Sequence, residues 1–382
     1  MRNSRIRFSA AVAAIAVAGS SAAMSSTASA MAAPRTSTPS FQIVGTTSSY
    51  LTSLVAPSLT SQWAFGSAEL NKPAPPVALQ HTGTRWVQAT MPAGANGGIV
   101  CAGASSPSNV WAFESLMFGP FGANTAAALH LSSGHWVIGH NFGSGLFVTG
   151  CNALSATNVW AFGSTGAGPA IGTWHLQGST WTQTTSYPAA SLGQASVVSP
   201  SNIWATGWDG VEGLLAHWNG SSWTADPSLL MALPKPSSSV NVQVQAVTAV
   251  SSANLWVEAN VGRMDSHGTW HYAPQVEHWN GVQWSQVMAS AFNYYLPVAV
   301  PDTHGGWWTA GYQASPPTSM TFLLHGSHGQ WVKVPLPAAP AGDRLEVTDV
   351  VNVPGTNVAY AVADEISETT GYGTGVMLKV TY

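Results

Sequence analysis

The sequence predicts an all-β protein, a seven-bladed β-propeller of four-stranded antiparallel blades. The first supporting observation is composition, because only 7% of the 382 residues are charged, whereas glycine and aromatic residues are abundant. This composition favours short strands joined by tight turns over solvated helices. The second observation is a pair of sequence phrases that recurs every 44 to 52 residues. A repeat of this length is typical of an architecture built from stacked units.

The first phrase is Ser-x-x-Asn, then Val, Ile or Leu, then Trp, at the start of an apolar strand. Well-matched copies occupy residues 106–115, 155–164, 199–208 and 251–260, and more divergent copies occupy residues 58–67 and 304–312. The anchor residues of the successive units are Trp63, Trp111, Trp160, Trp204, Trp256, Trp308 and Tyr360. Seven anchors predict seven blades.

The second phrase is an apolar strand, a Gly-containing turn and a strand that opens with Trp. Asn219-Gly220 and Asn280-Gly281 are strong signals for a two-residue hairpin within it. Its tryptophans are Trp86, Trp136, Trp181, Trp223, Trp284 and Trp331. With an alternating apolar segment such as 244–250 before the first phrase, each unit has four strands. One such unit cannot bury both faces of its sheet, so the units are expected to stack radially as blades.

The repeat explains most of the tryptophan and histidine. Twelve of the 18 tryptophans stand at the two repeated positions, where a large ring fills the gap between neighbouring sheets. Five histidines each precede a second-phrase Trp by six residues: His130, His175, His217, His278 and His325. A residue used once per blade is predicted to be a structural hydrogen-bonding group of the third strand rather than a catalytic base.

The N-terminus has the features of a secretory signal peptide over residues 1–30. Three arginines precede an apolar stretch, and Ala28-Ser29-Ala30 forms a small-x-small cleavage site. Residues 31–40 are then a linker, and the propeller spans residues 41–382. No later apolar run is long enough to span a bilayer. We therefore expect a secreted, extracellular monomer without membrane insertion.

The ends of the propeller segment suggest how the ring closes. Residues 375–382 match the third strand of a blade, and nothing follows them to form a fourth. Residues 41–47 have strand character and place Phe41 where other units have Trp. This N-terminal segment is predicted to complete the last blade, because an open ring would leave unpaired strand edges.

Charge and cysteine content indicate which class of partner is excluded and which covalent link is expected. Without the three arginines of the predicted signal peptide, 11 − 3 = 8 basic residues remain against 15 acidic ones, a formal charge of −7. These eight are scattered, so we expect no nucleic-acid partner. Cys101 and Cys151 precede two successive anchors by ten and nine residues, on the inner strands of adjacent blades. In an exported protein this pair favours a disulfide over free thiols.

The paired phrases, Ser-x-x-Asn-Val/Ile/Leu-Trp and His-Trp-Asn-Gly-x-x-Trp, resemble the repeat of a group of secreted bacterial β-propeller proteins common in actinomycetes. The resemblance covers residues 41–382 and implies kelch-like or galactose-oxidase-like blades. Many members place cysteines around the first phrase, whereas this chain has one cysteine in each of two units. A galactose-oxidase-like copper site would need a Tyr joined to a Cys and two histidines. This chain has only two cysteines, both on predicted inner strands, so we expect no cofactor.

Variable loops mark the candidate binding face. The turns within the two phrases are short and alike on one face, while connections such as 260–274 and 226–243 vary on the other. The aromatic and polar residues of these connections are Trp208, Asp209, Trp270, His271, Tyr272, Tyr294 and Tyr295. Exposed rings beside a carboxylate suit a sugar or an extended chain. The alternative is that the rings only pack the loops.

The favoured function is a secreted, non-catalytic propeller that binds a ligand on this face, either a carbohydrate or a partner protein. The alternative is an enzyme that acts on extracellular polysaccharide, which requires two carboxylates across the scissile bond. The candidate carboxylates have no informative spacing: Asp209, Glu212, Asp265, Glu346 and Asp349. Asp265, His267 and His271 offer ligands of metal-binding type, but an irregular loop does not fix them, so we expect no metal.

Overall fold

The computed structural model describes most of the propeller segment. The described residues are 40–69, 74–116, 125–144, 146–165, 173–183, 191–208, 212–289, 294–302, 306–313, 320–327, 330–367, 369–370 and 373–382. The predicted signal peptide and residues 31–39 of the predicted linker lie outside this part of the chain.

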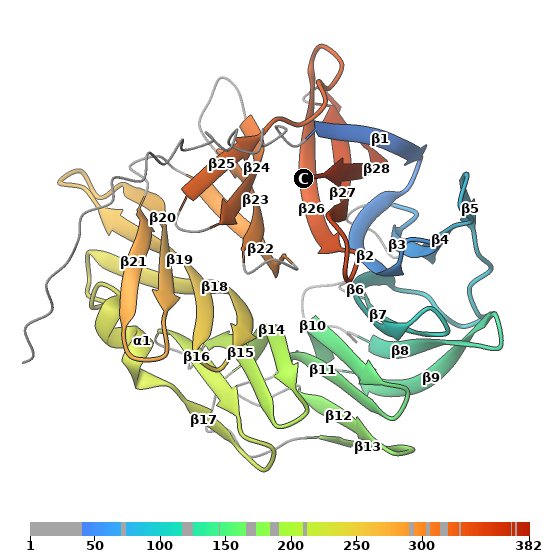
Figure 1. Ribbon diagram of the computed structural model, residues 1–382, viewed down its shortest axis with the longest axis horizontal. Coiled ribbons are helices and arrows are strands. Elements are labelled where there is room, and N and C mark those ends of the chain that lie inside the picture. Colours follow the sequence, from blue (N-terminus) through green and yellow to red (C-terminus); the bar gives the residue numbers. More distant parts are fainter. Residues whose placement is uncertain are drawn as a thin grey trace, which may run out of the picture. The chain divides into compact units, whose positions relative to one another are not determined.

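Seven four-stranded antiparallel sheets are arranged in a ring, which confirms the predicted seven-bladed β-propeller (Figure 1). Blade 1 holds β2 (Tyr50–Ser58), β3 (Ser61–Ser67), β4 (Pro76–His81) and β5 (Trp86–Gln88). Blade 2 holds β6 (Gly98–Ser106), β7 (Asn109–Leu116), β8 (Thr125–Ser132) and β9 (His135–Ser144). Blade 3 holds β10 (Leu146–Ser155), β11 (Asn158–Thr165), β12 (Trp174–Gln177) and β13 (Thr180–Gln183).

The remaining blades have the same strand order. Blade 4 holds β14 (Ser191–Ser199), β15 (Asn202–Trp208), β16 (Gly213–Trp218) and β17 (Trp223–Ala225). Blade 5 holds β18 (Val240–Ser251), β19 (Asn254–Met264), β20 (Trp270–Trp279) and β21 (Trp284–Ala289). Blade 6 holds β22 (Tyr294–Pro301), β23 (Trp307–Gln313), β24 (Met320–Ser327) and β25 (Gln330–Val334).

Blade 7 is built from both ends of the propeller segment. Its inner three strands are β26 (Asp343–Asn352), β27 (Val358–Ser367) and β28 (Gly373–Thr381), and its outer strand is β1 (Ser40–Thr47). β1 runs antiparallel to β28, with Phe41 opposite Val380 and Thr47 opposite Gly375. Phe41 packs against the apolar layer between blades 6 and 7. The N-terminal strand thus supplies the fourth strand that the C-terminal segment lacks.

The core consists of apolar layers between successive blades. The anchor Trp160 is fully buried and meets Trp218 and Trp223 of the next blade at ring-centroid distances of 5.2 and 6.0 Å. Trp308 is likewise fully buried, in the layer between blades 6 and 7. The repeated tryptophans therefore fill the gaps between sheets, as large flat rings do when they interdigitate.

The repeated histidines have the structural role that the sequence predicted. His217 Nε2 lies 2.9 Å from Oδ1 of Asn202, the Asn of the first phrase, and its ring stacks on Trp204 with centroids 4.2 Å apart. Blades 2, 3 and 5 repeat this contact in the pairs His130–Asn109, His175–Asn158 and His278–Asn254. Each pair joins the second strand of a blade to the third.

One helix interrupts the all-β pattern among the described residues. α1 (Pro227–Ala232) lies in the connection from blade 4 to blade 5, where the sequence predicts only a loop. Asp226 caps it by accepting a hydrogen bond from the Ser228 amide at 2.8 Å, and a proline follows the cap. Leu229 is fully buried against blade 5. No helix in these residues is long and apolar enough to cross a membrane.

Candidate functional site

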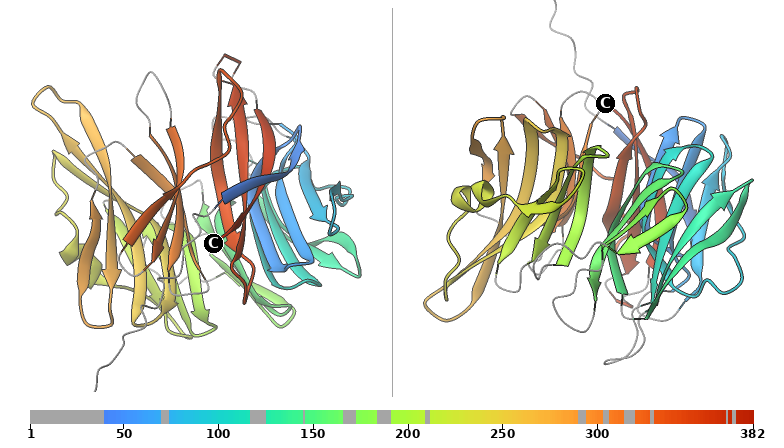
Figure 2. Two further views of the ribbon diagram at one scale, coloured as in Figure 1. Left: turned by 45° about the horizontal axis from the view of Figure 1, so that its top comes forward. Right: turned by 90° about the horizontal axis from the view of Figure 1, so that it is seen from below.

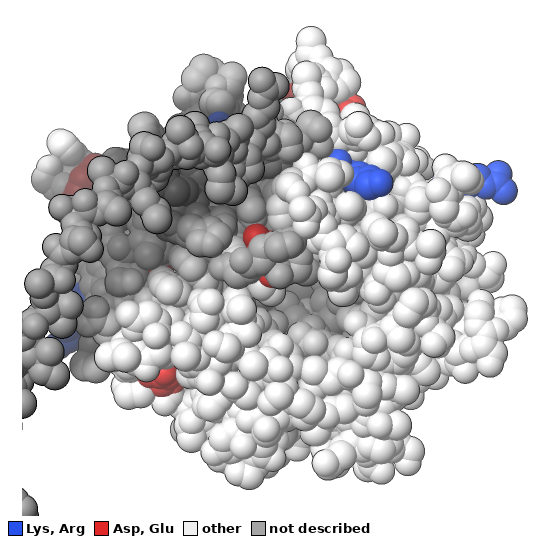
Figure 3. All heavy atoms as spheres, in the orientation of Figure 1, with Lys and Arg blue, Asp and Glu red and all other residues white. Residues whose placement is uncertain are grey.

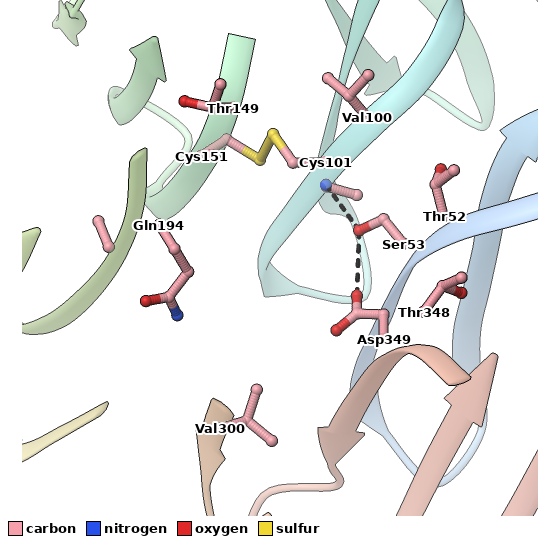
Figure 4. A pocket seen from close by; sticks show the side chains of 13 residues that line it. Thr52, Ser53, Val100, Cys101, Thr149, Cys151, Gln194, Val300, Thr348 and Asp349 are labelled. Carbon is pink, nitrogen blue, oxygen red and sulfur yellow. Dashed lines mark hydrogen bonds between the residues drawn. A yellow bond between two sulfur atoms is a disulfide. The ribbon is translucent and has the colours of Figure 1, made fainter. Parts of the chain in front are cut away.

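The inner strands of the ring enclose a pocket with a volume of about 190 Å³. Strands from six of the seven blades line it, which places it in the central channel. Its polar side chains are mostly hydroxyls, with one amide and one carboxyl group: Thr52, Ser53, Thr149, Thr348, Gln194 and Asp349. Figure 4 shows these side chains around the opening, with the two cysteines on one wall.

Asp349, on β26 of blade 7, is at one end of a hydrogen-bond chain across three blades. Its Oδ2 accepts from the Leu54 amide at 2.8 Å and from the Ser53 hydroxyl at 3.2 Å, both in blade 1. The Ser53 hydroxyl in turn accepts from the Ala102 amide of blade 2 at 3.0 Å (Figure 4). Burial raises the pKa of Asp349 to about 7, although these hydrogen bonds lower it.

Three threonines in the channel wall also join neighbouring blades. Thr52, Thr149 and Thr348 each stand at a β-bulge of an inner strand. The Thr149 hydroxyl donates to the Leu192 carbonyl at 3.1 Å and the Thr348 hydroxyl to the Leu51 carbonyl at 2.8 Å, each in the next blade. Thr52 donates in the same way to the Ile99 carbonyl.

Sequence reasoning missed these bulges, although a signal exists. Thr52 and Thr149 each stand eleven residues before the anchor Trp of their own blade. The constant spacing before the anchor is therefore the signal for the bulge. Most hydroxyls of the pocket thus hold the blades together, and Gln194 Oε1 likewise accepts from the Val247 amide of the next blade at 2.8 Å. The wall is chiefly a structural element.

Cys101 of β6 and Cys151 of β10 form a disulfide between blades 2 and 3, with Cα atoms 6.0 Å apart. Both residues line the pocket, and Figure 4 shows the bridge crossing from one inner strand to the next. The adjacent inner strands therefore come within the Cα separation that a disulfide requires.

The hairpin of β19 and β20 carries two of the predicted binding residues side by side. Trp270 and Tyr272 are half-buried, and their rings stack with centroids 6.2 Å apart and an interplanar angle of 28°. Both lie over Gly262, where a Cβ would come within 2.7 Å of the Tyr272 ring and 3.2 Å of the Trp270 ring. The missing side chain lets the rings lie flat on the strand. This hairpin projects from the rim of the ring (Figure 2).

His271 points to the opposite side of the hairpin from this aromatic pair. Its Nε2 lies 2.9 Å from Oδ2 of Asp265, and the two side chains are 59% and 34% exposed. Asp265 Oδ1 accepts from the amides of His267 and Thr269, so the carboxylate closes the turn. The hydrogen bond from His271 and these two amides lower the pKa of Asp265. The His267 ring does not join the pair, and the described residues contain no cluster of three His, Cys, Asp or Glu ligands.

The other predicted binding residues are distributed more widely. Trp208 lies on the face of β15 that carries Trp204, which packs toward blade 5 from blade 4. Trp270 and Tyr272 lie on the face of blade 5 that carries Trp256, which packs toward blade 6. Blade 5 therefore separates Trp208 from the aromatic pair.

Residues at the start of blade 6 are nearer to the pair. Tyr294 and Tyr295 begin β22, opposite Gln313 and Tyr312 of β23, and β22 contacts β20. The side chains of both tyrosines lie outside the described residues, as does all of Asp209. Among the described residues, the face of the ring seen in Figure 3 carries few charged side chains.

Comparison with known proteins identifies the fold but no family. No protein-family model matches the sequence, and no curated protein matches it. The chain is similar to a solved structure of YCF48 bound to D1 peptide, with a TM-score of 0.50 and 12% identity over 89% of this chain and 95% of that one. It is also similar to an α-L-arabinanase of Penicillium chrysogenum complexed with arabinobiose, with a TM-score of 0.49 and 9% identity over 89% and 97% of the two chains. At sequence identities this low, the similarity to these two proteins concerns the fold alone.

Proposed function

We propose that this protein is an exported, non-catalytic binding propeller that recognises extracellular carbohydrate. The observation that supports the proposal is the stacked pair Trp270 and Tyr272 on the projecting β19–β20 hairpin. One side of each ring covers Gly262 and both side chains stay half-exposed, so part of each side chain can be reached from solvent. Flat aromatic faces contact the CH groups of a sugar, and no charged ligand is implied.

The alternative function, cleavage of polysaccharide, has less support in the channel pocket. Glycoside hydrolysis uses two carboxyl groups on opposite sides of the scissile bond. The described lining of the pocket contains one, Asp349, and its oxygens already accept hydrogen bonds from Ser53, Leu54 and Val350. The proposal therefore favours binding on the hairpin over chemistry in the channel.

The proposal is tested by glycan-array screening and pull-down with insoluble polysaccharides, using the secreted protein. For the glycan that binds best, Trp270→Ala and Tyr272→Ala are each expected to weaken binding about 3- to 10-fold, the loss expected for one aromatic contact. Trp208→Ala is the matched control, because this ring faces the other side of blade 5, and it is expected to bind normally. Thermal unfolding of each variant checks that the ring is intact.

Three results would contradict the proposal. Binding that survives loss of both rings would place the ligand elsewhere, and specific capture of a protein with no glycan bound would favour a protein partner. Release of soluble oligosaccharide that is abolished by Asp349→Asn would support the enzymatic alternative instead.

A further inference from the structure

Four polar side chains that carry unpaired oxygens are buried in the interface between blades 5 and 6. Glu258 and Asn260 of β19 are 1% and 3% exposed, and Thr248 of β18 and Thr309 of β23 are fully buried. Both Glu258 carboxyl oxygens, the Asn260 Oδ1 and the two threonine hydroxyls lack a hydrogen bond within the described structure. Buried oxygens are almost always paired, so five unpaired oxygens in one interface require an explanation.

The strand registers bring these side chains to one interface. Glu258 and Asn260 share the face of β19 that carries Trp256, and Thr248 is the cross-strand partner of Trp256. The Trp256 ring lies 5.6 Å from the ring of Trp307 in blade 6. Thr309 follows Trp307 by two residues on the same face of β23, and its hydroxyl is close enough to lower the pKa of Glu258.

The same blade provides a contrast on its other side. Glu277 of β20 is also 1% exposed, but it faces blade 4 and accepts a hydrogen bond from Gln275 Nε2 at 2.7 Å. Burial raises the pKa of both carboxyl groups, and that of Glu258 is raised well above its usual range. Of these two, only Glu258 has carboxyl oxygens without a well-formed hydrogen bond, although the Thr309 hydroxyl lies near enough to lower its pKa. A buried carboxylate in this state is costly unless a cation accompanies it.

We propose that the interface between blades 5 and 6 binds a hard metal cation of the Ca²⁺ type through oxygens of Glu258, Asn260, Thr248 and Thr309. A ligand set of carboxylate, amide and hydroxyl oxygens without nitrogen or sulfur suits Ca²⁺ and disfavours Zn²⁺. A single carboxylate supplies little charge, so affinity lies at the weak end for Ca²⁺ sites, with a dissociation constant on the order of 10⁻⁴–10⁻³ M. The cation joins β18 and β19 to β23, and this inference does not depend on the proposed carbohydrate binding.

The first experiment uses the whole protein, stripped with chelator and kept in a choline buffer. Tb³⁺ replaces Ca²⁺ as the probe, because Trp256 and Trp307 beside the site can sensitise its luminescence. We expect sensitised emission that Ca²⁺ displaces and that Na⁺ does not. At Ca²⁺ about tenfold above the dissociation constant, Tm is expected to rise by roughly 2–4 °C.

Variants locate the cation. Glu258→Gln keeps the shape and removes the charge, and it is expected to abolish both the Tb³⁺ emission and the Ca²⁺-dependent rise in Tm. Glu277→Gln is the matched control and is expected to keep both. Thr309→Val, which leaves the carboxylate in place, is expected to weaken Ca²⁺ binding several-fold and tests the site if Glu258→Gln fails to fold.

Two outcomes would overturn the proposal. Tb³⁺ emission that persists in Glu258→Gln would place the ion elsewhere. Identical Tm values in Ca²⁺, Na⁺ and choline, with no sensitised emission, would show that Glu258 holds a proton and that the interface contains water only.

Discussion

At the residue scale, the histidine–asparagine pair buries an ionisable ring in its neutral form. Burial lowers the pKa of His130, His217 and His278, and it lowers that of His175 to about 4. A histidine whose pKa falls on folding contributes stability that is present above about pH 6.5 and is lost as pH falls. In blade 6 the acceptor is Asp302 in place of Asn, 2.7 Å from His325.

The buried carboxyl groups have the opposite pH dependence. Burial raises the pKa of Asp349 and of Asp364 to about 7, from an ordinary value of 3.8. Such a group keeps its proton in the folded state after the unfolded chain has lost it. Its contribution to stability is therefore fully present below about pH 4 and is lost as pH rises toward 7.

Asp349→Asn is predicted to remove one of these pH-dependent contributions. The variant is neutral at every pH, so its free energy of unfolding should gain on the wild type by about 2–3 kcal/mol between pH 5 and pH 8. Any hydrogen bond lost with the second carboxyl oxygen lowers the free energy of unfolding of the variant by the same amount at both pH values. Urea unfolding at the two pH values measures the difference, and a gap that is the same at both would show that Asp349 titrates normally.

At the element scale, the strand phrases were predictable because their signals are local. The anchor Trp, the Asn two residues before it and the Asn-Gly turn all lie within one blade. The same phrases therefore recur in blade after blade, and their spacing predicted all seven blades. The α1 helix was not predictable in this way, since it is one short turn capped by Asp226 and held by burial of Leu229. The bulges of the inner strands were missed because their threonines bond to the next blade.

The candidate site was only partly predictable for the same reason. The sequence marked Trp270 and Tyr272 as exposed aromatics in a long connection. Their parallel arrangement depends on the strand register that sets Tyr272 opposite Gly262. The partnerless oxygens of Glu258 and Thr309 come from different blades, and nothing in either strand alone indicates their proximity.

The N-terminal strand β1 is predicted to be essential for the stability of blade 7. Without it, β28 presents an unpaired edge and the layer between blades 6 and 7 loses Phe41. A chain of residues 48–382 should unfold at a lower temperature than a chain of residues 38–382 and should aggregate. Phe41→Ala is expected to cost about 1–3 kcal/mol in unfolding free energy. Equal Tm values for the two truncated chains would show that β1 contributes nothing.

At the scale of the whole molecule, stability depends on seven interfaces rather than on one central core. The interface between blades 7 and 1 closes the ring, and hydrogen bonds reinforce its apolar layer. Asp364 Oδ1 accepts from the Leu51 amide at 2.9 Å, and Asp349 and Thr348 add the contacts to Leu54 and Leu51 described above. The buried carboxyl groups of blade 7 thus bond directly to the inner strand of blade 1 across this interface.

The disulfide between Cys101 and Cys151 adds a covalent link at the interface between blades 2 and 3. The two residues are 50 positions apart, so the link restricts a long segment of the unfolded chain. The double variant Cys101→Ala/Cys151→Ala is predicted to lose about 2–4 kcal/mol of unfolding free energy. Urea unfolding of this variant and of the wild type with and without reductant measures the loss, and reduced wild type should approach the variant.

Thiol titration is the control, performed on the unfolded, unreduced protein. We expect no free thiol, because the two cysteines lie 6.0 Å apart at Cα, which meets the distance condition for a bridge, and the proposed export would meet the redox condition. Two free thiols per chain would rule the bridge out. The apolar layer between blades 2 and 3, which includes Trp111 and Val159, would then hold these blades together without a covalent bond.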